Sequence, residues 1–352
     1  MSSLRSVPLS VLDLAPVGTG SSHAAALRDT VDLARHAERL GFTRYWLAEH
    51  HSMPGIASSA TAVLVGAVAA ATTRIRVGSG GVMLPNHAPL VVAEQFGTLE
   101  ALHPGRIDLG IGRAPGTDPG TARALRRSPD ALSADDFPQQ LGELLGFFRG
   151  SFDGAHPYSR ITAVPGLGDE PPLWLLGSSG YSAQVAGMLG LPFAFAHHFS
   201  SAATLPALEL YRSRFEPSAV LDRPYAMVGV QVIAADDDES AHALAAPSAL
   251  AFLQLRQGRP GLLPSPAEAA AHRWTDLERA TAAERWRDQA VGGPDRVRDR
   301  LAELLEATDA DELIVTSMLH DHADRLRSLG IVRDLFGDPL PTGLQAALVG
   351  AA

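Results

Sequence analysis

The 352-residue chain contains neither cysteine nor lysine, and these two absences remove several kinds of chemistry. Without cysteine there are no disulfides, thiolate nucleophiles, iron–sulfur clusters or thiolate-ligated zinc sites. Because all 29 basic residues are arginine, a Schiff-base lysine and a P-loop lysine are excluded as well. Any redox chemistry must therefore come from a bound organic cofactor, or from a metal held by nitrogen and oxygen ligands.

Concentrated positive charge and long apolar runs are also missing. The formal net charge is −10 and no arginine-rich block stands out, so we expect no nucleic-acid partner. The longest apolar stretch, Ile56 to Ala71, is interrupted by serine and threonine and is shorter than the ~20 residues that span a bilayer. Near the N-terminus, Pro8, Asp13 and Pro16 break the apolar core that a secretory signal needs. These features predict a cytoplasmic enzyme that does not associate with membranes.

Short β-like runs alternate with longer helical stretches in eight consecutive units. The expected strands are Val7–Leu14, Thr43–Ala48, Ile75–Met83, Arg106–Ile111, Leu173–Leu176, Phe193–Ala196, Ala226–Ala234 and Leu313–Thr316. Such alternation is typical of parallel strands joined by crossover helices, and eight units favour a closed barrel over an open doubly wound sheet. We therefore predict the α/β class and a single (β/α)8 TIM barrel over residues 1–352.

Two stretches are longer than one strand–helix unit requires. They are Arg113–Ala134, after the fourth strand, and Pro247–Gly293, between the seventh and eighth strands. Both would follow the carboxyl ends of strands, where the active sites of barrel enzymes lie. The second stretch, rich in alanine, arginine and proline, is interpreted either as a lid or as a passive insertion.

Polar residues gather at the ends of the expected strands. Gly177–Ser182 would place backbone N–H groups at a helix N-terminus, which favours an anion site, and Arg113 from the neighbouring strand can supply a guanidinium to a phosphate. A plain N-cap turn beside a surface arginine is the alternative. Gly80 and Gly81 allow a flat group to lie against the backbone, or form a tight turn out of the barrel.

Six histidines invite a metal interpretation: His50, His51, His87, His103, His197 and His198. Adjacent histidines in a strand point to opposite faces, so each pair offers at most one inward ligand. A metal-dependent barrel hydrolase is therefore a secondary hypothesis, and no metal is expected. His50, beside Glu49, is the favoured titrating group. Four aromatic residues, Trp174, Phe195, Phe199 and Trp274, are candidates to line an apolar pocket, with core packing as the alternative.

Four segments resemble, in order and spacing, the bacterial luciferase-like, flavin-dependent monooxygenase superfamily. They are WLAEHH (46–51), VGSGGVMLPNHAP (77–89), AEQFGTLEALHPGRIDLGIGRAPG (93–116) and GSSGYSAQ (177–184). The similarity is greatest to the short luciferase-like oxidoreductases of the FMN type and covers nearly the whole chain except Pro247–Gly293. It departs at Gly112, where the light-emitting luciferase subunit has a reactive cysteine, so luciferase behaviour is not carried over.

The resemblance implies that FMN binds with its ring over the end of the third strand, where a non-proline cis peptide is expected at Gly80-Gly81. The implied cofactor-binding residues are Gly80, Gly81, Val82, Asn86, Arg113, Ala114, Ser178, Ser179, Gly180, Tyr181 and Ser182. Among them, Arg113 and the turn after the fifth strand would hold the phosphate. The catalytic position would be His50, acting as general acid or base and tuned by Glu49.

The implied reaction is an oxygenation. Reduced FMN, supplied by a separate flavin reductase, would react with O2 to form a flavin C4a-peroxide that oxygenates a small organic substrate. F420-dependent hydride transfer and flavin binding without catalysis are the alternatives within the superfamily. The resemblance also implies a homodimer, for which the alanine-rich helix expected over Ser58–Ala71 is the candidate contact surface.

Overall fold

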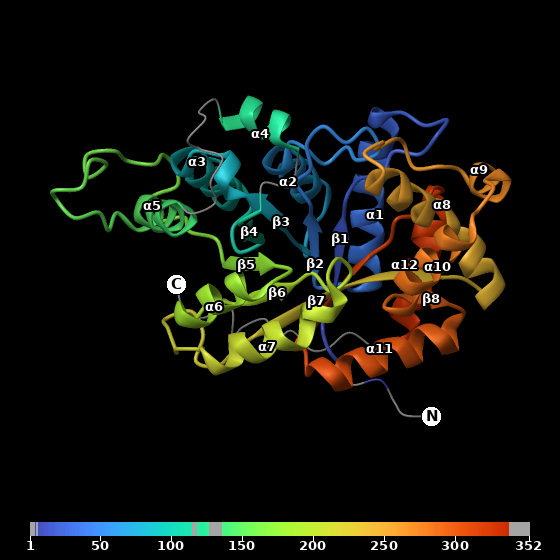
Figure 1. Ribbon diagram of the computed structural model, residues 1–352. Helices are drawn as coiled ribbons and strands as arrows, with labels where there is room; N and C mark the ends of the chain where they lie inside the picture. The colour runs from blue at the N-terminus through green and yellow to red at the C-terminus, as the bar shows by residue number, and fades with distance from the viewer. Residues whose placement is uncertain (1–3, 5, 115–117, 127–135, 338–352) are drawn as a thin grey trace.

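The computed structural model describes residues 4, 6–114, 118–126 and 136–337. At its centre, eight parallel strands close into a barrel surrounded by helices (Figure 1). In order around the barrel the strands are β1 (Leu9–Asp13), β2 (Arg44–Leu47), β3 (Arg76–Met83), β4 (Ile107–Gly112), β5 (Leu173–Gly177), β6 (Phe193–Phe195), β7 (Ala226–Ala234) and β9 (Glu312–Thr316), which pairs with β1. The predicted (β/α)8 TIM barrel is confirmed.

The connections between barrel strands carry the helices that cover the barrel. These are α1 (His23–Leu40), α2 (Thr61–Ala71), α3 (Pro89–Leu102), α5 (Phe137–Arg149), α6 (Gly180–Met188), α7 (Thr204–Ser213), α11 (Pro294–Thr308) and α12 (His322–Leu335). Shorter elements at the strand ends are η1 (Leu84–Asn86), α4 (Pro119–Arg126) and η3 (Ser201–Ala203). Within the described part of the chain, no helix is long and apolar enough to cross a membrane.

Helix α1 shows how local sequence sets an element's limits. The Ser22 hydroxyl accepts a hydrogen bond from the Ala25 backbone N–H at 3.2 Å, which satisfies one of the free donors at the helix start. Gly41 ends the helix in a left-handed conformation with φ of 79°, where a side chain would be strained. Both limits of the helix are therefore set by residues at its own ends.

The segment between β7 and β9 differs in detail from the expected Pro247–Gly293 insertion. Pro247 lies inside α8 (Asp238–Arg256), because the buried alanine-rich face around it continues the helix despite the missing N–H. After α9 (Pro266–Ala271) and α10 (Asp276–Arg287), a short strand β8 (Ala290–Gly292) pairs in parallel with β7. Three residues are too few for an alternating pattern, so β8 was not predicted.

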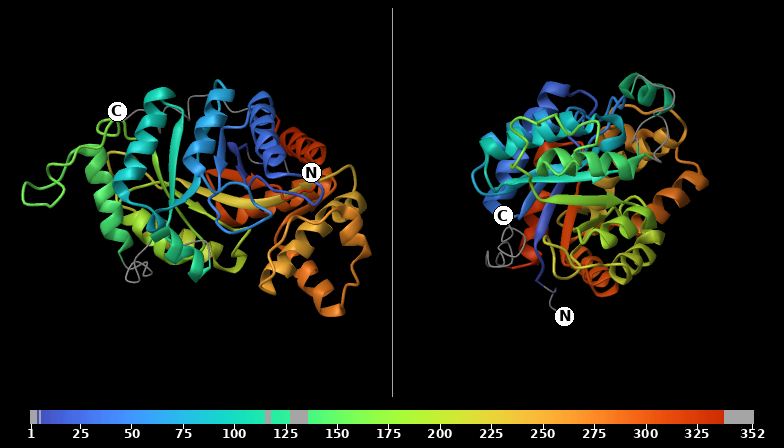
Figure 2. Two further views of the ribbon diagram at one scale, coloured as in Figure 1. Left: turned by 90° about the horizontal axis from the view of Figure 1, so that it is seen from above. Right: turned by 90° about the vertical axis from the view of Figure 1, so that its left-hand side faces the viewer.

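The additional elements after β7 form a lobe beside the barrel (Figure 2, orange). The lobe is tied to the loop after β1: the Thr19 N–H donates to the Leu263 carbonyl at 2.9 Å, and the Leu263 N–H donates to Val17 at 2.8 Å. The other long stretch, Arg113–Ala134, contains α4, while its residues 115–117 and 127–134 lie outside the described residues.

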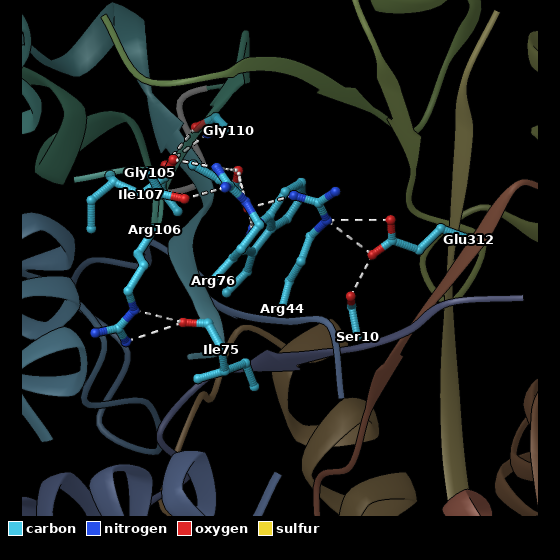
Figure 3. A network of polar contacts seen from close by, with 12 residues as sticks. Ser10, Arg44, Ile75, Arg76, Gly105, Arg106, Ile107, Gly110 and Glu312 are labelled. Carbon is cyan, nitrogen blue, oxygen red and sulfur yellow. Dashed lines mark hydrogen bonds and ion pairs between the residues drawn. The ribbon is translucent and has the colours of Figure 1, made fainter. Parts of the chain in front are cut away.

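Four buried charged residues fill the barrel interior near the amino ends of the strands (Figure 3). The Arg44 guanidinium lies 2.8 Å from an Asp108 oxygen and 3.1 Å from a Glu312 oxygen. Arg76 lies 2.6 Å from the other Asp108 oxygen. Further donors to these carboxylates are Ser10 Oγ, Trp46 Nε1 and Tyr225 OH. We call Arg44, Arg76, Asp108 and Glu312 the interior charge network; it links β2, β3, β4 and β9.

The interior charge network is electrostatically balanced. Burial would raise the pKa of Asp108, but attraction and hydrogen bonds from Arg44 and Arg76 keep that pKa below its usual value. Opposing charges at these distances offset much of the cost of removing each group from water. Removing any single charge would therefore leave its partners buried and uncompensated.

We expect Asp108→Asn to lower the free energy of unfolding by about 3–5 kcal/mol, because two guanidinium groups lose their shared carboxylate. Urea denaturation at pH 7 measures the change. The matched control is Asp295→Asn on α11, whose carboxylate is 79% exposed and pairs with Arg298; it should cost less than about 1 kcal/mol. Equal effects of the two substitutions would contradict the assigned role of the network.

Candidate active site

The carboxyl end of β2 carries Glu49, a buried carboxylate with two imidazole partners. One oxygen of Glu49, which is 2% exposed, accepts from His51 Nε2 at 2.9 Å and from His87 Nε2 at 2.8 Å. The second oxygen accepts from the Met83 N–H at 3.2 Å. Burial would raise the pKa of Glu49, but the hydrogen bonds from His51 and His87 lower it to about 2. Glu49 is thus a fixed negative charge at neutral pH.

His50 occupies a different environment from its neighbours. Its backbone N–H donates to the Ser58 carbonyl at 3.2 Å, but its buried Nδ1 has no hydrogen-bond partner among the described residues. Burial lowers the pKa of His50, and the charge of Glu49 only partly opposes this. The Glu49 carboxylate makes no hydrogen bond to the His50 ring, since it hydrogen-bonds His51 and His87 instead, and tuning of His50 by Glu49 stays a prediction. A neutral imidazole with an unsatisfied buried nitrogen is suited to contact a ligand.

The two histidines after β6 point to different surroundings. His198 Nδ1 lies 3.0 Å from the Gly229 carbonyl, and burial lowers the pKa of His198 to about 4. His197 is held at both ring nitrogens, by Thr204 Oγ1 at 2.8 Å and by the Asp288 carbonyl at 3.1 Å. His103 ends α3 at the opposite side of the barrel and does not belong to the site.

The peptide bond between Gly80 and Gly81 is cis, as the resemblance implies. A Cβ at Gly80 would lie 2.6 Å from Leu12 Cδ1, and one at Gly81 would lie 2.7 Å from the Gly110 carbonyl oxygen. The backbone of β4 therefore requires glycine at position 81, whereas a side chain at position 80 would meet the flexible end of Leu12. Val82 packs in the hydrophobic core between strands and helices, so a ligand in the barrel mouth would meet its backbone. Asn86 is buried in η1 and makes a polar contact there.

Arg113 lies beside the start of α6. The Arg113 guanidinium stacks 4.2 Å from the centroid of the Tyr181 ring, and no carboxylate among the described residues pairs with it. Ser179 is the N-cap of α6 but makes no side-chain capping bond. The first-turn N–H groups of the helix therefore lack a side-chain acceptor, which leaves them available to an anion.

The other predicted phosphate ligands lie around this point. Ser182 is buried in the first turn of α6 behind Gly177, where a Cβ would come within 2.8 Å of the Ser182 Cβ. Ser178 lies between β5 and α6, and the exposed Ala114 follows Arg113. The structure therefore brings the predicted residues of the fourth and fifth strand ends together.

A cavity of about 270 Å³ opens between the end of β6 and the lobe after β7. Its lining includes His198, Phe199, Phe252, Arg285, Asp288 and Gln289. Of the aromatic candidates, only Phe199 lies here. Trp174 and Phe195 are each 1% exposed and fill the core, and the Trp274 indole donates to the Ala269 carbonyl within the lobe. Arg285 and Phe252 escaped sequence reasoning because no motif marks the lobe.

Glu49, His51 and His87 also place their ligand atoms within 4.8 Å of one another, as a metal site would. Their contacts at 2.8 and 2.9 Å are those of direct hydrogen bonds, in which each imidazole N–H is satisfied by the same oxygen. The cluster is complete as a hydrogen-bonded group. It therefore adds no weight to the metal-hydrolase hypothesis.

Comparison with known proteins places these features in context. Residues 7–312 match the family model for luciferase-like monooxygenases. The chain is 55% identical over 328 residues to YvbT of Bacillus subtilis (strain 168), covering 93% of this chain and 96% of that protein. It is 49% identical over 331 residues to a luciferase-like monooxygenase of Escherichia coli (strain K12), covering 94% and 97%. A crystal structure of apo-MsnO8 superposes with a TM-score of 0.86 at 40% identity, covering 95% and 100%.

Two more distant solved structures share the fold alone. One is the oxygenating constituent of 3,6-diketocamphane monooxygenase from Pseudomonas putida in complex with FMN, with a TM-score of 0.72, 19% identity and coverage of 96% and 99%. The other is an F420-dependent secondary alcohol dehydrogenase in complex with an F420–acetone adduct, with a TM-score of 0.64, 14% identity and coverage of 95% and 100%.

We expect Glu49→Gln to lower stability at neutral pH by about 3 kcal/mol, the value of a pKa displaced from 4.5 to about 2. Because the folded-state pKa is lowered, the contribution is present above pH 4.5 and is lost as the pH falls toward 2. The difference from the wild type should therefore shrink across that window in urea titrations. The control is Glu303→Gln on α11, a 62% exposed side chain. A difference that stays constant with pH would contradict the assignment.

Proposed function

Because the chain belongs to the luciferase-like monooxygenase family, we propose that it is an FMN-dependent monooxygenase that uses reduced FMN and O2 to oxygenate a small organic substrate. One observation supports a cofactor that carries a phosphate: the Arg113 guanidinium lies beside the first turn of α6, whose N–H groups lack a side-chain cap. Together they form a site for a phosphate at the barrel mouth.

The residues present fit FMN. Arg113, Ser178, Ser179 and the N–H groups of the first turn of α6, at Gly180, Tyr181 and Ser182, would hold the phosphate. The flavin ring would lie over Gly80-Gly81, where the wall has no side chains, with Ala114, Asn86 and the Val82 backbone at its borders.

Reduced FMN supplies two electrons and activates O2, so that one oxygen atom enters the substrate and the other leaves as water. The protein orients the reactants, excludes water and moves protons. His50 is neutral because burial lowers its pKa, so its buried Nδ1 can accept a proton from the substrate side or, once protonated, return it. The fixed charge of Glu49 would stabilise the protonated imidazole. We propose that a separate flavin reductase supplies the reduced cofactor.

The main alternative is hydride transfer with F420, which the distant alcohol dehydrogenase of the same fold uses. The barrel and the positive site after β4 and β5 would serve either cofactor. Flavin binding without turnover is a weaker alternative, because the unsatisfied Nδ1 of His50 at the barrel mouth favours a chemical role for that side chain.

We expect purified protein to bind FMN or reduced FMN, measured by calorimetry, and Arg113→Ala to weaken this binding about 10- to 100-fold, the worth of a charge-assisted hydrogen bond. Riboflavin, which lacks the phosphate, should bind equally to both proteins. Arg149→Ala, which removes a half-exposed partner of Glu170, is the matched control and should bind FMN normally. F420 is titrated in the same way, and a preference for F420 would change the proposed reaction to hydride transfer. If the protein binds neither FMN, reduced FMN nor F420, the cofactor assignment is refuted.

We also propose a homodimer formed through α2 and the adjacent α3. The solvent-facing side of α2 consists of apolar residues, Val63, Ala67 and Ala70, and Val63 is 74% exposed. Leu102 of α3, 67% exposed, adds to this apolar surface. Exposed apolar side chains of this kind are typical of contacts between subunits.

Light scattering over a concentration series should give the mass of a dimer for the wild type and of a monomer for Val63→Arg, because the substitution places a charge at the contact. Leu255→Arg in α8, at a 44% exposed apolar position away from α2, is the control and should stay dimeric. A monomeric wild type at high concentration would refute the contact.

A further inference from the structure

Two arginines, Arg256 and Arg285, line the cavity between β6 and the lobe, and the protein itself holds Arg285 of α10 in place. Its Nη2 donates to Gln231 Oε1 at 3.0 Å, and its guanidinium stacks 4.3 Å from the centroid of the Phe252 ring. Gln231 is 2% exposed on β7, so this contact anchors Arg285 to the barrel. The side-chain Nε is buried and has no hydrogen-bond partner among the described residues.

The positive charge of Arg285 has no carboxylate partner in the described part of the chain. Burial lowers the pKa of Arg285, and no acidic group opposes that effect. Of the acidic residues in the lining, Asp288 accepts a hydrogen bond from Ser201 Oγ at 2.6 Å, and Glu284 is exposed to solvent. Removing a cation from water without an anion is costly, so a ligand anion would be stabilised here.

The strand β7 connects Arg285 to the barrel mouth. Gly229 and Gln231 are two residues apart, so they face the same side of β7. A Cβ at Gly229 would lie 3.0 Å from His198 Nδ1, and Gln231 holds Arg285. His198, which lines the Arg285 cavity, therefore lies against the same stretch of β7 that holds Arg285. A ligand anchored at Arg285 would lie along His198 on the barrel side of the cavity.

We propose that Arg285 binds the carboxylate of an acidic substrate whose apolar part lies against Phe252 and His198. The planar guanidinium matches a carboxylate in shape and charge, and Phe252 supplies an apolar wall. The cavity volume, about 270 Å³, is near the lower end for small-molecule sites, ~300 Å³. The identification of this anion as substrate depends on the proposed oxygenase function, whereas its binding does not require flavin.

Calorimetric titrations of the flavin-free, full-length protein with butanoate, hexanoate and octanoate test the proposal, each beside its neutral primary amide. We expect at least one carboxylate to bind at least about 10-fold more tightly than its amide, the effect of one charge-assisted contact. Arg285→Gln should abolish this preference, and Arg285→Lys, which keeps the charge, should retain part of it. Arg287→Gln, an exposed arginine two positions along α10, is the matched control and should behave as the wild type.

Equal binding of carboxylates and amides, no binding of any carboxylate, or an unchanged preference in Arg285→Gln would overturn the proposal. Thermal unfolding of each variant shows whether it is folded. If Arg285→Lys keeps the carboxylate preference and Arg285→Gln loses it, the loss is due to the missing charge and not to a damaged fold. FMN titration of Arg285→Gln should match the wild type. A carboxylate preference without flavin binding would support the anion site and refute the oxygenase, whereas flavin binding without the preference would do the opposite.

Discussion

The ion pairs of Arg44 with Asp108 and Glu312 hold the inside of the barrel together, and the rest of the molecule depends on them. These groups lie on β2, β4 and β9, and Arg76 adds β3 through Asp108. Each charge is buried, so each is stable only while its partners are in place. The network therefore couples strands far apart in sequence and fills the amino half of the barrel. Only the carboxyl half remains for a ligand.

The carboxyl half shows the opposite electrostatic pattern. There Nδ1 of His50 and Nε of Arg285 have no hydrogen-bond partner among the described residues, and the Arg113 guanidinium pairs with no described carboxylate. Groups of this kind are costly unless a ligand satisfies them. Glu49 is the exception, since His51 and His87 saturate one of its oxygens and keep it charged. One barrel thus combines a balanced end, which supports the fold, with an unbalanced end, which suits anionic ligands.

The lobe after β7 belongs to the unbalanced end. Its hydrogen bonds through Leu263 to Val17 and Thr19 tie it to the loop after β1. Arg285 and Gln231 tie it to β7 from the other side. Anchored at two places, the lobe forms a wall of the mouth and carries the Arg285 cavity. The lid or passive insertion considered from the sequence thus contributes side chains to the candidate site.

The features that the sequence by itself determines are those that depend on local interactions along the chain. The alternation of strand and helix patterns, the Ser22 cap and Gly41 end of α1, and the motif around Gly80-Gly81 depend on residues close in the chain. Tertiary structure alone decided the partners. Glu49 adjoins His50 in sequence, yet it hydrogen-bonds His87, 38 positions away, and Arg285 reaches Gln231, 54 positions away. Such pairings exist only once the barrel has closed, because closure, not chain proximity, determines which strand ends meet.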